Sequence, residues 1–277
     1  MNDPITSLQN PRVKAAVRLR DRRDRDRDGR FRIEGYREVL RAVESGLPID
    51  ELFTAEDLFL GENEPSLIER AITECGASEV PVNDAVFQKL SYRDRPDGLL
   101  AIAPIPTWDM ASLDARRPTN DRPLVLVAQA IEKPGNLGTM LRTADAVGVD
   151  AVVVCDRCTD IWNPNVVRAS VGTLFSVPVA EGTSEEVRAW LREREIPLVA
   201  TTPDTLTRHT EVDLSGAAAL VIGSEQYGLD DSWLDECDFR VRIPMRGSAD
   251  SLNAAISAAV VLFEAQRQRD EAAAAEE

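Results

Sequence analysis

The sequence predicts an α/β fold built on a parallel sheet, because apolar runs and helical stretches alternate through its second half. Four runs are continuously apolar, as expected of strands that are covered on both faces. They occupy residues 124–128, 151–154, 198–200 and 219–222. Stretches with helical spacing separate them, at residues 139–147, 166–172 and 184–195. This order is typical of a parallel sheet with helices packed on its faces.

The C-terminal segment predicts one more helix, which is amphipathic. It is expected to begin near Ser251, a residue type that often caps a helix N-terminus. Apolar residues then recur at helical spacing, which would place them on one stripe facing the core. They are Leu252, Ile256, Ala259, Val260 and Phe263.

A proline-rich stretch divides the chain into two predicted domains. Residues 104–123 are expected to form a linker, since this density of proline disfavours both helices and central strands. Residues 1–103 would form a small α/β domain, with a helix at 37–44 that Gly46 stops, and strands around 52–53 and 99–102. Residues 124–277 would form the larger domain.

Bulk composition is ordinary for a globular protein, with 43% hydrophobic and 29% charged residues. No apolar run approaches the roughly 20 residues needed to cross a bilayer, so no membrane partner is expected. The N-terminal segment lacks the apolar stretch of a signal peptide. We therefore expect a cytoplasmic protein.

Charge is distributed unevenly along the chain. The formal net charge is −16, which by itself argues against a nucleic-acid partner. Residues 1–48, however, contain 12 basic and 8 acidic residues, so this end is locally basic and can still engage phosphates. Within it, residues 18–32 alternate Arg and Asp, a pattern typical of a solvated helix face with ion pairs. Phosphate contact by some of these arginines remains open.

Cysteine and histidine give little support for a metal site. The chain has four cysteines and one histidine, His209. Cys155 and Cys158 have C-x-x-C spacing, but no second pair follows, and the simpler interpretation is one reduced thiol at a strand end and another in the next loop. We expect no bound metal.

Three polar loops, each of which contains glycine, follow predicted strands, at residues 132–139, 223–229 and 243–248. In open α/β sheets the ligand crevice lies at the carboxyl ends of the strands, so these loops are expected to converge on one site. None contains G-x-G-x-x-G or a P-loop, which removes the main support for an ordinary nucleotide-binding enzyme. Arg142 lies about one and a half helical turns after Asn136, and both are expected to face the crevice.

The residues of these loops are similar to the three motifs of the SpoU/TrmH family of RNA methyltransferases, and they occur in the family's order. The first is Asn136-x-Gly138-x-x-x-Arg142 and the second is Gly223-x-Glu225-x-x-Gly228-Leu229. The third is Ile243-Pro244-Met245 followed by Ser251-Leu252-Asn253-x-Ala255-x-Ser257. Near the N-terminus, Asn10-Pro11 and Phe31-x-Ile33-Glu34-Gly35 resemble the family's small substrate-binding domain.

The resemblance implies structural features that periodicity cannot supply. It implies that the C-terminal part of the α/β domain is threaded into a deep trefoil knot, an exception to the usual connection rules. It also implies a homodimer with the active site near the subunit interface. The cofactor would be S-adenosylmethionine, held in a bent form among the knotted loops.

Site residues follow from the resemblance position by position. Gly223, Ile243 and Leu252 match residues that contact S-adenosylmethionine, and Thr201 is assigned to the same site. A catalytic set of five residues is also implied. It consists of Asn136, Arg142, Glu225, Ser251 and Asn253.

The individual roles of the catalytic set remain open. Arg142 would help to deprotonate the ribose hydroxyl, although a guanidinium has a pKa above roughly 12. It could instead hold a substrate phosphate or stabilise the developing alkoxide. Glu225 could orient substrate or act as a helix-turn acid, and Ser251 and Asn253 could be helix caps as well as site residues.

The predicted function is therefore S-adenosylmethionine-dependent methylation of a ribose 2′-hydroxyl in ribosomal or transfer RNA. The alternative is a non-catalytic RNA- or ribosome-binding protein on the same fold. The complete set of motif residues favours the enzyme.

Overall fold

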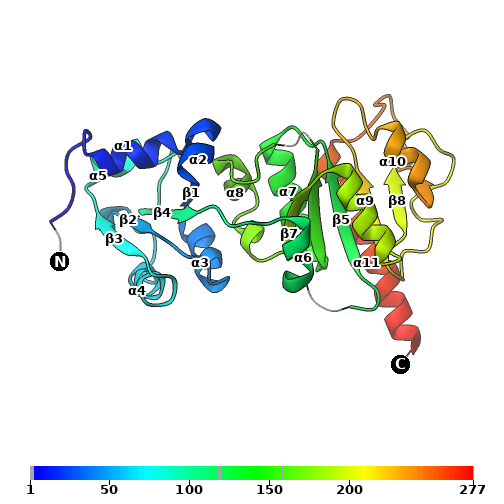
Figure 1. Cartoon of the computed structure of the whole chain (residues 1–277), viewed down its shortest axis with the longest axis horizontal. Helices are drawn as coiled ribbons and strands as arrows, with labels where there is room; N and C mark the ends of the chain where they lie inside the picture. Colours follow the sequence, from blue (N-terminus) through cyan, green and yellow to red (C-terminus); the bar gives the residue numbers. More distant parts are fainter. Residues whose placement is uncertain (1–2, 118–119, 157–158, 277) are drawn as a thin grey trace. The chain divides into compact units, whose positions relative to one another are not determined.

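The computed structural model describes residues 3–117, 120–156 and 159–276 (Figure 1). The chain forms two compact units. The first comprises Met1–Pro106 and Asp160–Ser176, and the second comprises Thr107–Thr159 and Val177–Glu277. Each unit contains one sheet.

The second unit contains a six-stranded sheet in the order β10-β8-β9-β5-β6-β7, and every neighbouring pair is parallel. This confirms the predicted α/β fold with a parallel sheet. The four predicted strands are present, and β7 and β10 are additional short strands at the two edges. The bounds are β5 Leu124–Gln129, β6 Ala151–Cys155, β7 Val179–Gly182, β8 Leu198–Thr201, β9 Ala218–Ile222 and β10 Phe239–Val241.

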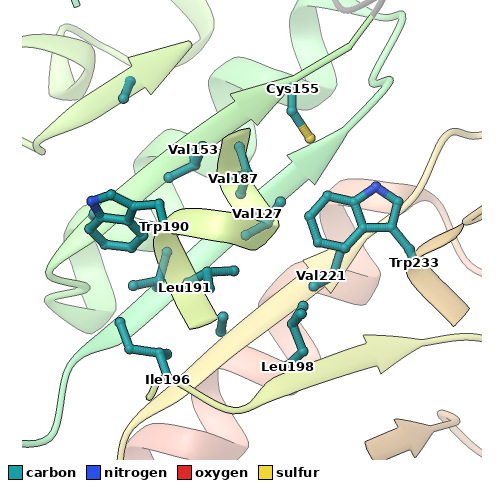
Figure 2. Packing of buried hydrophobic residues seen from close by; sticks show 14 of the residues in the cluster. Val127, Val153, Cys155, Val187, Trp190, Leu191, Ile196, Leu198, Val221 and Trp233 are labelled. Carbon is teal, nitrogen blue, oxygen red and sulfur yellow. The ribbon is translucent and has the colours of Figure 1, made fainter. Parts of the chain in front are cut away.

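Helices cover both faces of this sheet. On one face, side chains of α6 (Met110–Arg116), α9 (Ser184–Glu193) and α10 (Asp231–Glu236) form a core with alternate strand residues such as Val127 and Val153. Figure 2 shows part of this cluster, with Trp190 of α9 and Trp233 of α10 on either side of the aliphatic side chains. On the other face, α7 (Pro134–Val147) packs against α11 (Ala254–Glu276), which also contacts β9.

Two helix starts in this unit differ from the sequence prediction. Helix α7 begins at Pro134 rather than near Thr139, since proline fits the first helical position, where its missing N–H costs nothing. Helix α11 begins at Ala254 rather than near Ser251. Asn136 therefore lies in the first turn of a helix, and Ser251 lies in the preceding loop.

The apolar stripe of α11 that was predicted to face the core is wrong. Ile256 and Phe263 are exposed, and the buried face of α11 is formed instead by residues such as Val261 and Leu262.

The first unit contains a mixed four-stranded sheet in the order β1-β4-β2-β3. The predicted helix at 37–44 is confirmed as α3, Tyr36–Glu44, and the predicted strands become β2, Glu51–Thr54, and β4, Leu99–Pro104. The remaining strands are β1 Arg30–Glu34 and β3 Ser78–Pro81. The remaining helices are α1 Pro11–Arg18, α2 Arg22–Asp28, α4 Glu64–Cys75 and α5 Asp84–Leu90, with a short 3-10 helix, η1, at Glu56–Leu58.

The segment between β6 and β7 belongs to the first unit rather than to the sheet that it interrupts. It contains α8 (Pro164–Ala169) and the 3-10 helix η2 (Thr173–Phe175), and α8 packs on β1. The ring of Trp162 lies 4.6 Å from that of Phe31, measured between centroids. The helix expected at 166–172 is therefore present as α8, but it belongs to the first unit.

A buried ion pair holds this segment. Arg25, in the middle of α2, is 1% exposed and donates from Nε and Nη2 to Asp160 at 2.9 and 2.5 Å. The neighbouring pairs of α2, such as Arg22 with Asp26, are exposed as the alternating sequence predicts. Arg25 is buried, contrary to the prediction, because its partner Asp160 lies 135 residues away in sequence. A local sequence pattern carries no information about such a contact.

The proline-rich stretch at 104–123 contains more structure than a linker would. Met110–Arg116 forms α6, capped by the side chain of Asp109, and Leu113 is fully buried in the core of the second unit. Pro118 and Thr119 lie outside the described residues. Among the described helices, none is both long and apolar enough to cross a membrane.

Candidate active site

Three strand ends form a pocket at one edge of the parallel sheet. Strands β10, β8 and β9 are neighbours and run in the same direction, so their carboxyl ends lie together. A cavity of about 360 Å³ lies there, within the size range of small-molecule sites. Thr201 ends β8, Gly223 follows β9 and Ile243 follows β10, and all three line the cavity with Leu252. The structure thus brings together the four residues predicted to hold the cofactor.

The backbone packing around position 223 leaves no room for a side chain and therefore requires glycine. A Cβ at this position would lie 2.3 Å from the carbonyl carbon of Gly228 and 2.4 Å from the amide nitrogen of Leu229. The backbone of the 223–229 loop folds back on itself, with Ser224 and Gly228 exchanging two backbone hydrogen bonds of 3.1 Å. The loop therefore presents a tight backbone surface to the cavity, which a side chain at Gly223 would disrupt.

The cavity offers both apolar walls and an unsatisfied polar group. Ile222, Leu229, Leu234 and Met245 add apolar surface to that of Ile243 and Leu252. The hydroxyl of Thr201 is buried and has no hydrogen-bond partner among the described residues. An apolar cleft with a few free polar groups fits the adenine ring of S-adenosylmethionine.

Several residues that line the cavity were not predicted from the sequence, although they lie in or next to the predicted loops. Tyr227, Met245 and Asp250 line the cavity from within or beside the second and third motifs. Tyr227 is 78% exposed at the tip of its loop. Membership of a strand-end loop was the available signal for all three.

Beside the cavity, three polar side chains from different loops form a hydrogen-bonded chain. Asn253 donates from Nδ2 to Oδ1 of Asn136 at 3.0 Å. Asn136 in turn donates from its own Nδ2 to Oε1 of Glu225 at 2.5 Å. The backbone amide of Glu132 donates to the other oxygen of Glu225 at 3.2 Å. The neighbouring positions of β5 and β9 in the sheet explain why these loops meet.

The charge state of Glu225 follows from these contacts. Partial burial alone would raise the pKa of its carboxyl. The hydrogen bond from Asn136 and those from backbone amides, including those of Glu132 and Lys133, outweigh it, so the pKa is lowered. Glu225 is therefore ionised at neutral pH and serves as a fixed acceptor that orients the Asn136 amide.

Asn253, and not Ser251, caps helix α11. Oδ1 of Asn253 accepts from the amides of Ala255 and Ile256 at 3.0 and 3.4 Å. The side-chain oxygen of Asn253 therefore caps the helix, while its side-chain NH2 group donates to Asn136. Ser251 is exposed and lines the cavity.

Arg142 stands apart from the other predicted catalytic residues. It is exposed on α7, does not line the cavity and has no ion pair with any described residue. Six residues of α-helix turn through about 240° beyond a full turn, so Asn136 and Arg142 point in different directions from α7. The expectation that both face one crevice of the same chain is not met.

No group of three metal-binding side chains gathers within the part of the chain that the structure describes. Cys155 is buried at the end of β6, and Cys158, its predicted neighbour in the C-x-x-C spacing, lies outside the described residues.

The chain matches known family models over both units. The SpoU rRNA methylase family model matches residues 123–263, which include all three motifs and the cavity. The MRM3-like substrate binding domain model matches residues 10–101. The fold and the strand-end site define a methyltransferase class, and the chain belongs to the SpoU rRNA methylase family.

Named relatives extend over nearly the whole chain. A 23S rRNA (uridine(2479)-2′-O)-methyltransferase from Streptomyces viridochromogenes is 33% identical over 259 residues, covering 91% of this chain and 87% of that protein. An RNA 2′-O ribose methyltransferase of known structure is 41% identical with a TM-score of 0.81, covering 96% and 99% of the two chains. An AdoMet-bound rRNA methyltransferase from Sinorhizobium meliloti is 30% identical with a TM-score of 0.84, covering 96% and 97%.

Proposed function

We propose that this protein is an S-adenosylmethionine-dependent methyltransferase that modifies a ribose 2′-hydroxyl of ribosomal RNA. The observation that carries the proposal is the cavity lined by Thr201, Gly223, Ile243 and Leu252, with the Asn136–Glu225 hydrogen bond beside it. A non-catalytic RNA-binding protein would have no use for a cofactor-sized cavity next to an ordered polar chain. The names of the relatives favour ribosomal over transfer RNA. A ribosomal substrate also fits the expected cytoplasmic location.

The cavity residues would hold the cofactor, which supplies an electrophilic methyl group when bound. The tight 223–229 backbone and the side chains of Ile243 and Leu252 would contact it, and the unpartnered hydroxyl of Thr201 would give or accept one hydrogen bond. The apolar walls would exclude water from the reacting atoms, which strengthens polar interactions there.

The polar chain beside the cavity would position the ribose. An asparagine Nδ2 carries two hydrogens, and Asn136 uses one of them for Glu225. The second remains available to a ribose oxygen. Because Glu225 and Asn253 fix the Asn136 amide from both sides, this donor is oriented before the substrate arrives. Glu225 itself is a weak base, since its pKa is lowered.

Arg142 would act on the substrate rather than on the cofactor. A guanidinium stays protonated at neutral pH, so it would bind a substrate phosphate or stabilise the negative charge that develops on the ribose oxygen. Its exposed position outside the cavity of its own chain suits a site completed by a second subunit.

We propose a homodimer for this reason and for one more. Ile256 and Phe263 are 49% and 51% exposed on α11, and a separation of seven residues places them on one face of the helix. This apolar face lies on the helix that packs against α7, the helix of Arg142. Self-association through this face would bury both side chains and bring Arg142 toward the partner subunit.

We also propose that the C-terminal segment passes through a knot, as the family resemblance implies. The chain order supports it: β9 lies in the middle of the sheet, the chain then returns to the edge as β10, and α11 comes back to contact β9 and α7. The residues between β10 and α11 line the same cavity as the 223–229 loop, so the proposed crossing would lie where the cofactor would bind.

The test is a methyl-transfer assay with radiolabelled S-adenosylmethionine and ribosomal RNA from cells that lack the gene. The RNA is digested to nucleosides, and the label is located by mass spectrometry. We expect one 2′-O-methylated nucleoside and no label on a base. Calorimetry with S-adenosylmethionine on the purified protein accompanies the assay, and absence of binding would contradict the proposal.

A further inference from the structure

The ring of Tyr92 lies on the surface of the first unit, between two residues that anchor the backbone. Ser91 is buried and donates its hydroxyl to the carboxylate of Glu34, and Arg93 donates to the carbonyl oxygen of Glu34 at 2.8 Å. The amide of Tyr92 itself donates to the Glu34 carboxylate at 2.8 Å. The chain is therefore held at three consecutive residues, while 47% of Tyr92 remains exposed.

The guanidinium of Arg20 covers one face of this ring. Its Cζ atom lies 5.8 Å from the ring centroid, within the range of a cation–π contact. Nη2 of Arg20 also donates to three backbone carbonyl oxygens at the C-terminal end of α5. They belong to Lys89, Leu90 and Ser91, at 2.8, 3.2 and 2.7 Å. The protein itself thus holds Arg20 over the ring, so the two groups form a platform of fixed orientation.

The small cavity beside Tyr92 is positively charged. Arg32, Arg93 and Arg168 line it together with a single carboxylate, that of Glu34, and all of them belong to the first unit. Arg32 is buried and contributes only its electrostatic field. Arg168, on α8, is exposed and forms no ion pair with any described residue, so its guanidinium is free to bind an anion such as a phosphate.

We propose that Tyr92 is a stacking site for an unpaired base of the substrate RNA, and that Arg168 contacts a neighbouring phosphate. The proposal rests on the proposed function and names a part of its RNA-binding surface. An exposed aromatic ring beside arginines is a combination that suits single-stranded RNA, because the base stacks on the ring and positive charge attracts the backbone. The base would take the face of the ring away from Arg20. A double helix keeps its bases stacked on one another and offers no free base to Tyr92.

The experiment measures the binding of fluorescein-labelled RNA to the full-length protein by fluorescence anisotropy, at low salt and without S-adenosylmethionine. The probes are a short oligoadenylate, the same strand paired with oligouridylate, and a strand of the same length without bases. We expect the single-stranded oligoadenylate to bind most tightly, because it alone combines phosphates with unpaired bases. Equal affinity for the oligoadenylate and the strand without bases would overturn the proposal.

Substitutions of Tyr92 locate the stacking contact. Tyr92→Ala should weaken oligoadenylate binding about tenfold and leave the strand without bases unaffected, because only stacking is lost. Tyr92→Phe keeps the ring and should bind as wild type does. Phe239→Ala is the matched control, because its ring is 45% exposed in β10 of the second unit, and it should change neither affinity. Unchanged oligoadenylate affinity in Tyr92→Ala would contradict the stacking role, as would an equal loss for all three probes.

Substitution of Arg168 tests the phosphate contact. Arg168→Ala should weaken both single-stranded probes by the same factor and lower the dependence of log affinity on log salt by about one, because one phosphate contact is lost. Arg70→Ala removes the same charge from α4, where Arg70 pairs with Glu74, and should leave the salt dependence unchanged. An Arg168→Ala protein with the wild-type salt dependence would contradict this contact.

Activity measurements separate the stacking site from the proposed function. In the methyl-transfer assay, Tyr92→Ala should raise KM for RNA, while kcat and S-adenosylmethionine affinity stay at wild-type values. Wild-type protein that fails to bind S-adenosylmethionine, but loses oligoadenylate affinity on Tyr92→Ala, would contradict the proposed function alone. Wild-type protein that transfers methyl groups, with a Tyr92→Ala variant unchanged in KM and in oligoadenylate affinity, would contradict the stacking site alone.

Discussion

Asn136 donates its side-chain amide to the carboxylate of Glu225 over 2.5 Å, joining the first turn of α7 to the 223–229 loop, 89 residues away in sequence. The contact fixes which way the amide points, because the carboxylate can only accept when it is ionised. It also keeps Glu225 ionised, since a donated hydrogen bond favours the charged form. In the proposed function, the two residues would act as one positioning unit at the edge of the cavity.

Replacing Asn136 with Asp should break this unit. The amide donor of Asn136 is lost, so the ribose is no longer held. The new carboxylate also faces that of Glu225, and the two negative charges repel each other. We expect turnover to fall by about 10² or more. S-adenosylmethionine affinity, measured by calorimetry, should stay within about twofold, because Asn136 does not line the cavity. A variant that loses cofactor binding in proportion to activity would assign Asn136 to the cofactor instead.

Replacing Arg142 with Ala should separate chemistry from cofactor binding more sharply. We expect the single-turnover rate to fall by about 10² or more, as when an electrostatic partner of a developing charge is removed. Cofactor affinity should barely change, since Arg142 lies outside the cavity. Arg142→Lys keeps the charge and should recover part of the rate. A near-normal rate in the alanine variant would remove Arg142 from the mechanism.

The lowered pKa of Glu225 predicts how the site responds to acid. A carboxyl whose pKa is lowered on folding stabilises the folded protein at pH values above the ordinary glutamate pKa. This contribution is lost as the pH falls through the pKa that the group has in the folded protein. Wild type should therefore exceed Glu225→Gln in stability at pH 7, and the difference should vanish in acid. Urea denaturation of both proteins between pH 3 and pH 7 measures it.

The control for this comparison is Glu69→Gln, at an exposed position whose side chain has no hydrogen bond to any described residue. Its stability difference from wild type should be small and nearly independent of pH. A difference for Glu225→Gln that grows toward acid would mean that the sign of the shift is wrong.

The buried ion pair of Arg25 with Asp160 predicts that a substitution of Arg25 lowers stability strongly, although the sequence of α2 is typical of a solvated helix. Arg25→Ala leaves Asp160 nearly buried without its partner and should cost about 3–5 kcal/mol of unfolding free energy. Arg22→Ala, on the same helix, removes one half of an exposed pair and should cost less than about 1 kcal/mol. Urea denaturation distinguishes the two, and equal effects would contradict the structural role of Arg25.

The proposed dimer predicts that an exposed apolar side chain of α11 controls assembly. Phe263→Asp places a charge in the expected interface and should yield a monomer by light scattering at micromolar concentration, with activity lost. Leu206→Asp changes a residue that is 84% exposed and outside α11, so it should leave the dimer intact. A wild-type protein that is already monomeric would refute the arrangement.

The sequence by itself determined the parallel sheet and the loops that matter. Residues 124–128, 151–154, 198–200 and 219–222 of β5, β6, β8 and β9 are all apolar because the strands are covered on both faces, and this pattern is local. Since parallel strands end at one edge, the loops after them had to meet. The resemblance to the SpoU/TrmH motifs, and not this pattern, assigned Gly223, Ile243, Leu252 and Thr201 to one site, and all four line the same cavity.

Only the tertiary structure decided which residues pair across the chain. Periodicity describes one face of one element, and it carries no information about a partner 135 residues away, as for Arg25 and Asp160. The same limit hid the assignment of residues 160–176 to the first unit. It also hid the separation of Arg142 from Asn136, which depends on where α7 begins and on the direction in which each side chain leaves it.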